Sequence, residues 1–523
     1  MGWCENGAPL RIPPVTLPMP LLAAFLLIAL PWLNPFASGP TPAVEPLLFS
    51  WACAVVLLVV VRAGSGRTPR DAWARVIAAA WLLAALLSAW IGLLQYFGVS
   101  AGLGDWVNTT RLGEAYANLR QRNQFATLIN IGLVALLWWV AQSRVTPAVA
   151  QSHAAPDWRP AAGMAAAVLL GLGNAASSSR TGLVQLGLVA VLVLMWTRRG
   201  AGWRHSAIRR VLLVTGLTYG VAAFALPILA GNDSGILSRL HDGAPACASR
   251  LILWRNVIHL IGQHPWLGWG WGELDFAHFI TLYPGPRFCE ILDNAHNLPL
   301  HLAVELGIPV ALVVCGGGLW WVWRAQPWRE TDATRQLAWG VLAVILLHSL
   351  LEYPLWYGPF QMALGLSVWL LWRRPGPVSD EISGAFRSPA LVLTAWAALI
   401  SIALLAYVAR DYHRISQIYR APAQRSAAYR DNTLEKISQV RFFQDQVRFA
   451  ELTTTPLSPA NAAHLHDLAV DLLHFSPEPR VAELLIESAV MLGRDEEALF
   501  YLQRYKAAFP DNHARWMARQ GRR

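Results

Sequence analysis

The residues best suited to chemistry lie in the stretch 290–307, EILDNAHNLPLHLAVELG, where a polar loop turns into an apolar segment. His296 stands at this boundary, and the carboxylates Glu290 and Asp293 precede it closely. A carboxylate beside an imidazole fixes the tautomer of the ring and raises its basicity, as a general base requires. Ionisable groups at a membrane boundary are costly and usually mark a reacting centre. We therefore predict a reactive His296; a helix-capping histidine is the simpler alternative.

Two arginines are the candidates for binding an anion. Arg180 lies in the turn SSSRTG between two apolar segments and has no acidic neighbour in sequence. Its guanidinium needs an anionic partner, which a lipid phosphate, a substrate diphosphate or a distant carboxylate would supply. We predict a substrate phosphate. Arg255 lies in 250–261, where Leu251 and Ile258 recur at helical spacing, and this pattern predicts an amphipathic helix along the membrane surface. Arg255 falls on the more polar side of that helix.

Further polar residues gather beside other apolar segments. The run NLRQRNQFAT, 118–127, offers amide and guanidinium groups that could face a polar substrate, or could simply cap a helix. The segment HSLLEYPLWYGPF, 348–360, adds an acid and tyrosines at the same face. The candidate contacts to a polar substrate are Gln121, Arg122, Asn123, Asp293, Asn297, Glu352 and Tyr353.

The composition excludes an ordinary soluble protein, because 55% of the 523 residues are hydrophobic and only 14% are charged. Many of the charges are concentrated at the end of the chain, in 410–523. The net charge of +10 could suggest a nucleic-acid partner, but the excess lies in short arginine clusters between apolar segments, as membrane orientation requires. We therefore predict a protein that contacts membrane lipids and no nucleic acid.

Apolar runs that are long enough, or nearly long enough, to cross a bilayer recur along the chain. They lie at 15–32, 46–61, 74–96, 124–141, 161–178, 181–197, 209–229, 296–321, 336–351, 355–372 and 389–409. The sequence thus predicts an all-α polytopic membrane protein with about eleven transmembrane helices. Every second loop carries arginines, which places those loops and the N-terminus in the cytoplasm and the C-terminal segment outside.

This pattern divides the chain into four regions. Transmembrane helices occupy 1–229 and 296–409, and a large outer loop with the interfacial helix and catalytic residues occupies 230–295. The segment 410–523 is predicted to be a soluble helical domain. Within it, Phe475 and Phe509 are 34 residues apart, which is the period of one tetratricopeptide (TPR) unit. Such a TPR-like domain could bind an acceptor protein or serve only as a structural cap.

The five cysteines have no metal-binding spacing, so we expect no metal site. Cys247 and Cys289 lie in the large outer loop, where an oxidising compartment would permit a disulfide. The sequence does not decide whether they pair. Cys4, Cys53 and Cys315 are interpreted as packing or surface residues.

Together, several segments of this chain resemble the O-antigen ligase superfamily of bacterial membrane glycosyltransferases in order and spacing. They are NLRQRNQFAT, SSSRTG, LWRNV with HPWLGWG, and DNAHN with ELG. The first of these segments and the region 389–523 are most similar to its protein O-oligosaccharyltransferase branch, the pilin-glycosylating ligases. The resemblance covers nearly the whole chain. It implies a multi-pass protein of the bacterial inner membrane, with the active site and the C-terminal domain in the periplasm.

The same resemblance implies an undecaprenyl-diphosphate oligosaccharide as donor and its inverting transfer en bloc, without a metal or a cofactor. His296 would take the proton of an acceptor hydroxyl, and Arg180 and Arg255 would hold the diphosphate leaving group. The acceptor would be a serine or threonine of a periplasmic or pilin-like protein.

Three alternatives share parts of this pattern. An O-antigen ligase would transfer the glycan to lipid A–core, and a polymerase would extend the glycan on the same lipid carrier. The C-terminal region and 118–127 favour the protein acceptor over lipid A–core. A polytopic transporter is the alternative from a different class. Transporters commonly carry internal repeats, whereas the polar residues here gather at one membrane face.

Overall fold

The computed structural model describes residues 19–37, 39–64, 68–142, 159–198, 203–231, 246–373 and 389–520. Every regular element in these ranges is a helix, which confirms the all-α class. The N-terminal tail with Cys4 and the loop residues 232–245 lie outside the described residues, so their predicted placement is not tested.

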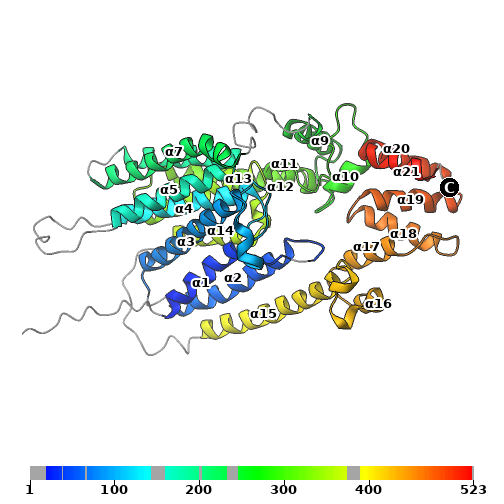
Figure 1. Cartoon of the computed structure of the whole chain (residues 1–523), viewed down its shortest axis with the longest axis horizontal. Coiled ribbons are helices and arrows are strands. Elements are labelled where there is room, and N and C mark those ends of the chain that lie inside the picture. Colours follow the sequence, from blue (N-terminus) through cyan, green and yellow to red (C-terminus); the bar gives the residue numbers. More distant parts are fainter. Residues whose placement is uncertain are drawn as a thin grey trace, which may run out of the picture.

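A bundle of long helices forms one half of the molecule (Figure 1). Its helices are α1 (Met19–Leu33), α2 (Val44–Gly64), α3 (Arg70–Tyr96), α4 (Arg122–Gln142), α5 (Arg159–Ala176), α6 (Arg180–Thr197), α7 (Trp203–Leu229), α12 (Ile308–Ala325), α13 (Ala333–Ser349), α14 (Gly358–Trp372) and α15 (Pro389–Ser416). Seven helices in the described residues are long and apolar enough to cross a membrane. The chain is thus a multi-pass membrane protein, and the count of eleven spans stays a prediction.

Helix α4 is the centre of this bundle. It packs against α3, α5, α6 and α13, and most of its length is buried. The close approach of α4 to α3 depends on small residues, because a Cβ added at Gly132 of α4 would lie 2.2 Å from the Cβ of Ala85 on α3. The central position matters for function, because the first turn of α4 carries the polar run predicted to face a substrate.

The apolar run 296–321, predicted as one span, is divided into two helices. Helix α11 (Leu298–Leu306) ends at Gly307, and α12 begins at the next residue. Gly307 has φ +87°, and a Cβ there would meet the carbonyl oxygen of Trp266 at 2.1 Å. The loop that contains Trp266 is therefore pressed against the break, and its Pro265 carbonyl accepts a hydrogen bond of 2.8 Å from the N–H of Ile308. Only glycine fits such a junction.

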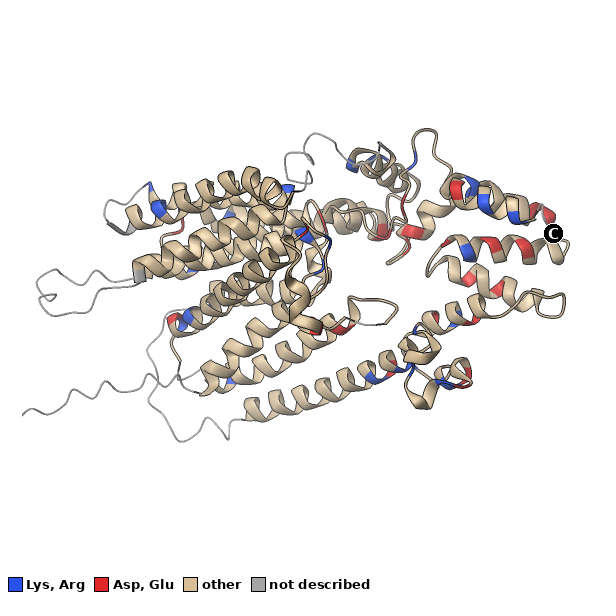
Figure 2. Ribbon diagram, viewed as in Figure 1, with Lys and Arg blue, Asp and Glu red and all other residues tan. Residues whose placement is uncertain are grey.

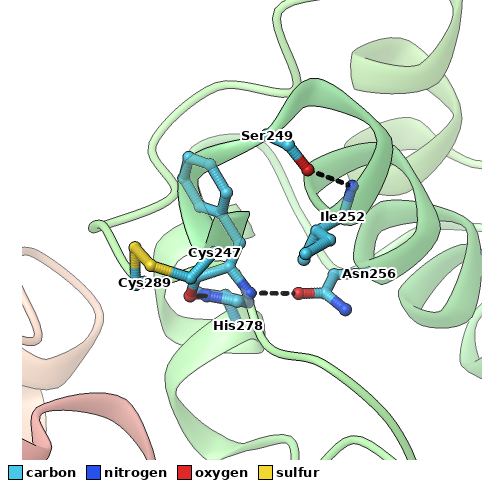
Figure 3. Close-up of a disulfide and its surroundings, with 7 residues drawn as sticks. Cys247, Ser249, Ile252, Asn256, His278 and Cys289 are labelled. Carbon is cyan, nitrogen blue, oxygen red and sulfur yellow. Dashed lines mark hydrogen bonds between the residues drawn. A yellow bond between two sulfur atoms is a disulfide. The ribbon is translucent and has the colours of Figure 1, made fainter. Parts of the chain in front are cut away.

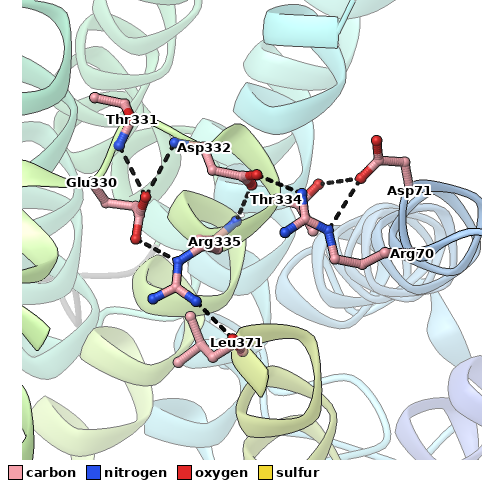
Figure 4. A network of polar contacts seen from close by, with 8 residues as sticks. All are labelled: Arg70, Asp71, Glu330, Thr331, Asp332, Thr334, Arg335 and Leu371. Carbon is pink, nitrogen blue, oxygen red and sulfur yellow. Dashed lines mark hydrogen bonds and ion pairs between the residues drawn. The ribbon is translucent and has the colours of Figure 1, made fainter. Parts of the chain in front are cut away.

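A polar network closes one end of the bundle (Figure 4). Arg70, the buried first residue of α3, pairs with Asp71 and with Asp332, which caps the start of α13. Arg335 bonds to Glu330 and to the carbonyl of Leu371 near the end of α14. Because the network joins the starts of α3 and α13 to the end of α14, the residues that follow α13 lie at the opposite end of the bundle.

Beyond that opposite end lie the shorter helices and the C-terminal domain (Figure 1). These elements are η1 (Ser100–Trp106), η3 (Ala246–Ala248), α9 (Arg250–Gln263), α10 (Leu274–Ile280), η5 (Pro354–Trp356), η7 (Pro422–Gln424), η8 (Ala427–Tyr429), α16 (Thr433–Ile437), α17 (Gln444–Thr454), α18 (Ala462–Leu473), α19 (Pro479–Met491), α20 (Asp495–Ala508) and α21 (Pro510–Gln520). A further short helix, η4 (Pro327–Arg329), directly precedes Glu330 and lies at the end of the Arg70 network. Charged residues are concentrated on this domain (Figure 2). Helix α15 continues past residue 409 to Ser416, so it leads directly into the domain.

The C-terminal domain packs on helix α10 of the large loop. Phe279 of α10 belongs to the apolar core formed by α17 to α21. Glu273 accepts a hydrogen bond of 2.7 Å from Nδ1 of His474, and Arg504 donates one of 2.8 Å to the carbonyl of Ile280. The break between α19 and α20 falls around Gly493, as the sequence predicts. Whether this helical array is TPR-like stays a prediction, but its attachment places it beside the large loop.

Candidate active site

His296 and Glu352 form a hydrogen-bonded pair at the end of the bundle opposite the Arg70 network. Nδ1 of His296 lies 2.6 Å from Oε2 of Glu352. Burial acts to raise the pKa of Glu352, but the hydrogen bond from His296 and the nearby positive charges outweigh it, so the pKa is lowered. An ionised carboxylate can only accept hydrogen bonds, so Nδ1 carries the hydrogen, and in the neutral imidazole Nε2 is the nitrogen with the lone pair. Nε2 is therefore the atom able to take a proton.

The backbone at His296 is held in an unusual conformation. His296 has φ +49°, in the left-handed region that few residues other than glycine adopt. Its N–H donates to Oδ1 of Asn294 at 2.8 Å, and the carbonyl before it accepts from Nε1 of Trp254 at 3.1 Å. The next residue, Asn297, caps α11 and donates to the carbonyl of Leu350 at 3.0 Å. These contacts tie the His296 loop both to α9 and to the end of α13.

The other oxygen of Glu352 connects three more segments. Oε1 accepts from the guanidinium of Arg250, at the start of α9, and from Nδ2 of Asn123 at 3.2 Å. Oδ1 of Asn123 in turn accepts from Oγ of Ser179 at 2.6 Å. Ser179 caps α6, whose first residue is the exposed Arg180. The starts of α4, α6 and α9 therefore converge on one carboxylate beside the histidine.

The carboxylate that bonds to His296 is not one of the two that the sequence suggested. Glu290 is exposed on the loop, and Asp293 also keeps an exposed surface. Among the described contacts, neither side chain makes a hydrogen bond with His296. Glu352, 56 residues from His296, makes the bond instead. In the sequence, the signal for Glu352 was the presence of an acid between two apolar runs.

Arg250, and not Arg255, is the arginine of α9 that contacts Glu352. Arg250 reaches Glu352, whereas Arg255 is exposed and has no side-chain partner among the residues described. At about 100° per residue, five positions turn a helix by about 140°, so the two side chains cannot share a face. A role for Arg255 in binding the donor stays a prediction. Arg250 was missed because the local pattern placed it within an apolar stripe.

Helix α9 itself confirms the predicted helix over 250–261 and refines its faces. Leu253, Val257 and Leu260 are buried against the large loop and α11. Leu251 and Ile258, members of the predicted apolar stripe, are 74% and 58% exposed. The helix therefore has one apolar face inside the protein and a second one open, as a helix along a membrane surface requires.

Three candidates lie in the polar run 118–127, and only one of them, Asn123, contacts the His296–Glu352 pair. Oε1 of Gln121 accepts from the N–H of Gln124 at 2.7 Å, which is a helix-capping contact. Arg122 forms an ion pair of 2.8 Å with Glu114 in its own loop. Asn123, by contrast, bridges Glu352 and α6. For Gln121 and Arg122 the observed contacts match the capping interpretation, and their substrate contacts stay predictions.

Tyr353 forms an aromatic wall beside the imidazole. Its ring centroid lies 5.1 Å from that of His296, with the planes at 67°. Burial raises the pKa of Tyr353, so its hydroxyl stays protonated and can donate a hydrogen bond. Tyr353 also stacks on Tyr357 at 6.0 Å. The site thus combines a base, charged groups and aromatic faces, which suits a substrate with both anionic and sugar-like parts.

Cys247 and Cys289 are joined by a disulfide with a Cα–Cα distance of 5.4 Å (Figure 3). Next to it, the N–H of Phe288 donates to Oδ1 of Asn256 at 2.8 Å. Cys247 lies three residues before Arg250, and Cys289 lies seven residues before His296. The disulfide therefore links the two segments that carry the arginine and the histidine of the site.

We expect Cys289→Ser to lower the turnover of this site about 10- to 100-fold, because small displacements of reacting groups carry penalties of that size. The measurement is the initial rate of transfer for purified protein, with and without a reducing agent. Cys315→Ser, in the exposed membrane helix α12, is the matched control and should keep the wild-type rate. An unchanged rate for Cys289→Ser would show that the disulfide does not position the site.

The helical bundle and the His–Glu pair at one of its ends define a multi-pass membrane protein with an interfacial site. Three family models match it, and they are described as O-antigen ligase (165–315), protein glycosylation ligase (115–140) and virulence factor membrane-bound polymerase, C-terminal (336–522). The first of these ranges contains Arg180, Arg250 and His296.

Two curated relatives come from Acinetobacter baylyi. A general O-oligosaccharyltransferase is 24% identical over 73% of this chain and 64% of its own length. A ComP-specific O-oligosaccharyltransferase is 25% identical over 48% of this chain and 43% of its own. The matched part therefore spans less than two thirds of either relative. Together with the family models, these matches confirm the resemblance to the O-antigen ligase superfamily and its protein-glycosylating branch.

Proposed function

We propose that this protein is a glycosyltransferase that moves an oligosaccharide en bloc from undecaprenyl diphosphate to serine or threonine hydroxyls of periplasmic or pilin-like proteins. The observation that carries the proposal is the His296–Glu352 pair, with Arg250 on the same carboxylate. The O-oligosaccharyltransferase relatives support the transfer of a glycan to a protein.

In the proposed reaction, Nε2 of His296 takes the proton of the acceptor hydroxyl. The hydroxyl oxygen attacks the anomeric carbon of the first sugar from the face opposite the diphosphate. The bond between that carbon and the diphosphate oxygen breaks, so the configuration inverts and undecaprenyl diphosphate leaves. Glu352 stabilises the positive charge that develops on the imidazole, as a carboxylate on Nδ1 does in other histidine bases.

Negative charge develops on the departing diphosphate, and two arginines stabilise this charge. Arg180 at the start of α6 and Arg250 at the start of α9 flank the pair, and bidentate guanidinium contacts strengthen as that charge grows. The N-terminus of α6 adds its own partial positive charge. In this scheme the protein supplies the positive charge without a metal. In the same scheme, Asp293, Asn297 and Tyr353 contact the sugar or the acceptor.

We expect Arg250→Lys to lower kcat/KM roughly 100-fold, because an ammonium cannot replace a forked guanidinium that contacts both a carboxylate and a diphosphate. Arg255→Lys tests the alternative, favoured by the sequence, that Arg255 binds the donor diphosphate. Steady-state kinetics with varied donor concentration measure both. Loss of activity in the Arg255 variant alone would move the donor site to the exposed side of α9.

The site is proposed to face the periplasm, with the N-terminus in the cytoplasm and the protein in the inner membrane. Among the described residues, Arg335 and Arg373 lie at the end of the bundle that carries the Arg70 network, as arginines beside cytoplasmic loops do. A disulfide in the large loop fits an oxidising compartment on the other side. The C-terminal domain docks on α10 of that loop, so it would stand next to the site and could hold an acceptor protein.

Reconstitution of the purified protein with an undecaprenyl-diphosphate oligosaccharide tests the proposal. A pilin-like protein and lipid A–core are offered side by side. Glycosylated protein is the expected product, and product on lipid A–core alone would instead make this an O-antigen ligase. The polymerase-type match over 336–522 favours one further candidate, a glycan polymerase, which would lengthen the lipid-linked glycan without either acceptor.

A further inference from the structure

A line of aromatic rings leads away from the reacting histidine. The ring of Tyr353 contacts His296, and Trp356 lies 6.4 Å from Tyr353, edge to face. Trp271 then stacks on Trp356, with centroids 6.1 Å apart and planes within 10°. The buried His301 touches both tryptophans edge-on, at 5.0 Å and 6.2 Å. The reaction as proposed uses only the first of these rings.

The last ring of this line has a fixed position and an open face. Trp271 is 62% exposed, although one of its faces is covered by Trp356. The backbone before it is fixed, because the N–H of Trp269 and that of Gly270 donate to carbonyls at the end of α11, at 2.9 Å and 3.0 Å. Gly270 has φ +118°, so the chain turns directly before the ring. An exposed tryptophan that follows an anchored backbone and lies against another ring is suited to stacking on a flat ligand surface.

Trp271 is close in sequence to a contact with the soluble domain. Glu273, two residues later, bonds to His474 of α18 at 2.7 Å. Trp266 provides a contrast, because its backbone packs against Gly307, where the candidate span α12 begins. Trp266 therefore belongs to the membrane boundary, where tryptophans commonly lie. The ring of Trp271 instead contacts those of His301 and Trp356.

We propose that Tyr353, Trp356 and Trp271 form a saccharide-binding subsite for the distal sugars of the donor. This inference rests on the proposed function. Pyranose rings present apolar C–H faces that stack on aromatic rings, and each step along the line is about one sugar ring long. The first sugar sits at His296 beside Tyr353, so Trp271 meets a sugar further along the chain. The subsite thus selects donors that carry an oligosaccharide over donors that carry one sugar.

A comparison of two donor substrates distinguishes the role of this subsite from that of the reacting centre. One is undecaprenyl diphosphate with an oligosaccharide, and the other carries only the first sugar; the acceptor protein is the same. We expect Trp271→Ala to raise KM for the oligosaccharide donor roughly tenfold, as loss of one aromatic stacking contact would. KM for the monosaccharide donor and both kcat values should stay the same. Trp271→Phe keeps a stacking face and should restore most of the affinity.

Trp266→Ala is the matched control, because it removes an exposed tryptophan of the same loop that lies outside the line of rings. It should leave the KM of both donors unchanged. Equal KM changes for the two donors in Trp271→Ala, or no change at all, would overturn the subsite while leaving the proposed function intact. Wild-type protein that transfers from neither donor would overturn the proposed function, and the subsite with it.

Discussion

Replacing His296 with alanine is expected to abolish glycan transfer, with a fall in kcat of about 10³-fold or more, because the proposed base for the acceptor hydroxyl is removed. The imidazole is half-buried, and its Nδ1 is held by Glu352 at 2.6 Å, so its loss removes one contact and leaves the helices in place. The measurement is transfer to a pilin-like protein by reconstituted protein at saturating donor.

His296→Asn is the stricter form of this experiment. Asparagine tolerates the left-handed backbone at this position and can still bond to Glu352, but it cannot take a proton near neutral pH. Its melting temperature in detergent should equal that of the wild type, while transfer is lost. Full activity in either variant would remove His296 from the mechanism.

Glu352→Gln is expected to lower kcat about 100-fold or more. The neutral amide no longer stabilises a charged imidazole, and its NH₂ group can donate to Nδ1 and so select the wrong tautomer. The substitution also leaves Arg250 without its counter-charge. Glu352→Asp keeps the charge and should retain more activity than the glutamine variant. Equal rates for wild type and Glu352→Gln would show that the carboxylate does not act through His296.

The pH dependence of stability gives an independent readout of the same carboxylate. Burial acts to raise the pKa of Glu352, but its hydrogen bond to His296 and nearby charges lower it below the ordinary value of 4.5. A lowered folded-state pKa stabilises the protein above that value, and the contribution is lost as the pH falls through the folded-state pKa. Melting temperatures measured from about pH 5 to about pH 3 should therefore fall less steeply for Glu352→Gln than for the wild type.

Part of this site could be read from local sequence. His296 at the start of an apolar helix, Arg180 in its capped turn and the helix over 250–261 are all where the patterns predicted them. Local signals suffice there, because a cap, a turn and an amphipathic period are encoded within a few residues of each other. The break at Gly307 was missed, because the apolar run 296–321 continues through it.

The sequence by itself determined the class of protein, and it indicated most of the helical segments and the candidate histidine. Tertiary structure alone decided which side chains meet it. Glu352 is 56 residues from His296 and 102 from Arg250, and the carboxylate suggested by proximity in sequence is not the one that bonds. Periodicity tells which face of a helix is apolar, but not which distant helix ends come together. Here the packing of α4, α6 and α13 brings those ends to one carboxylate.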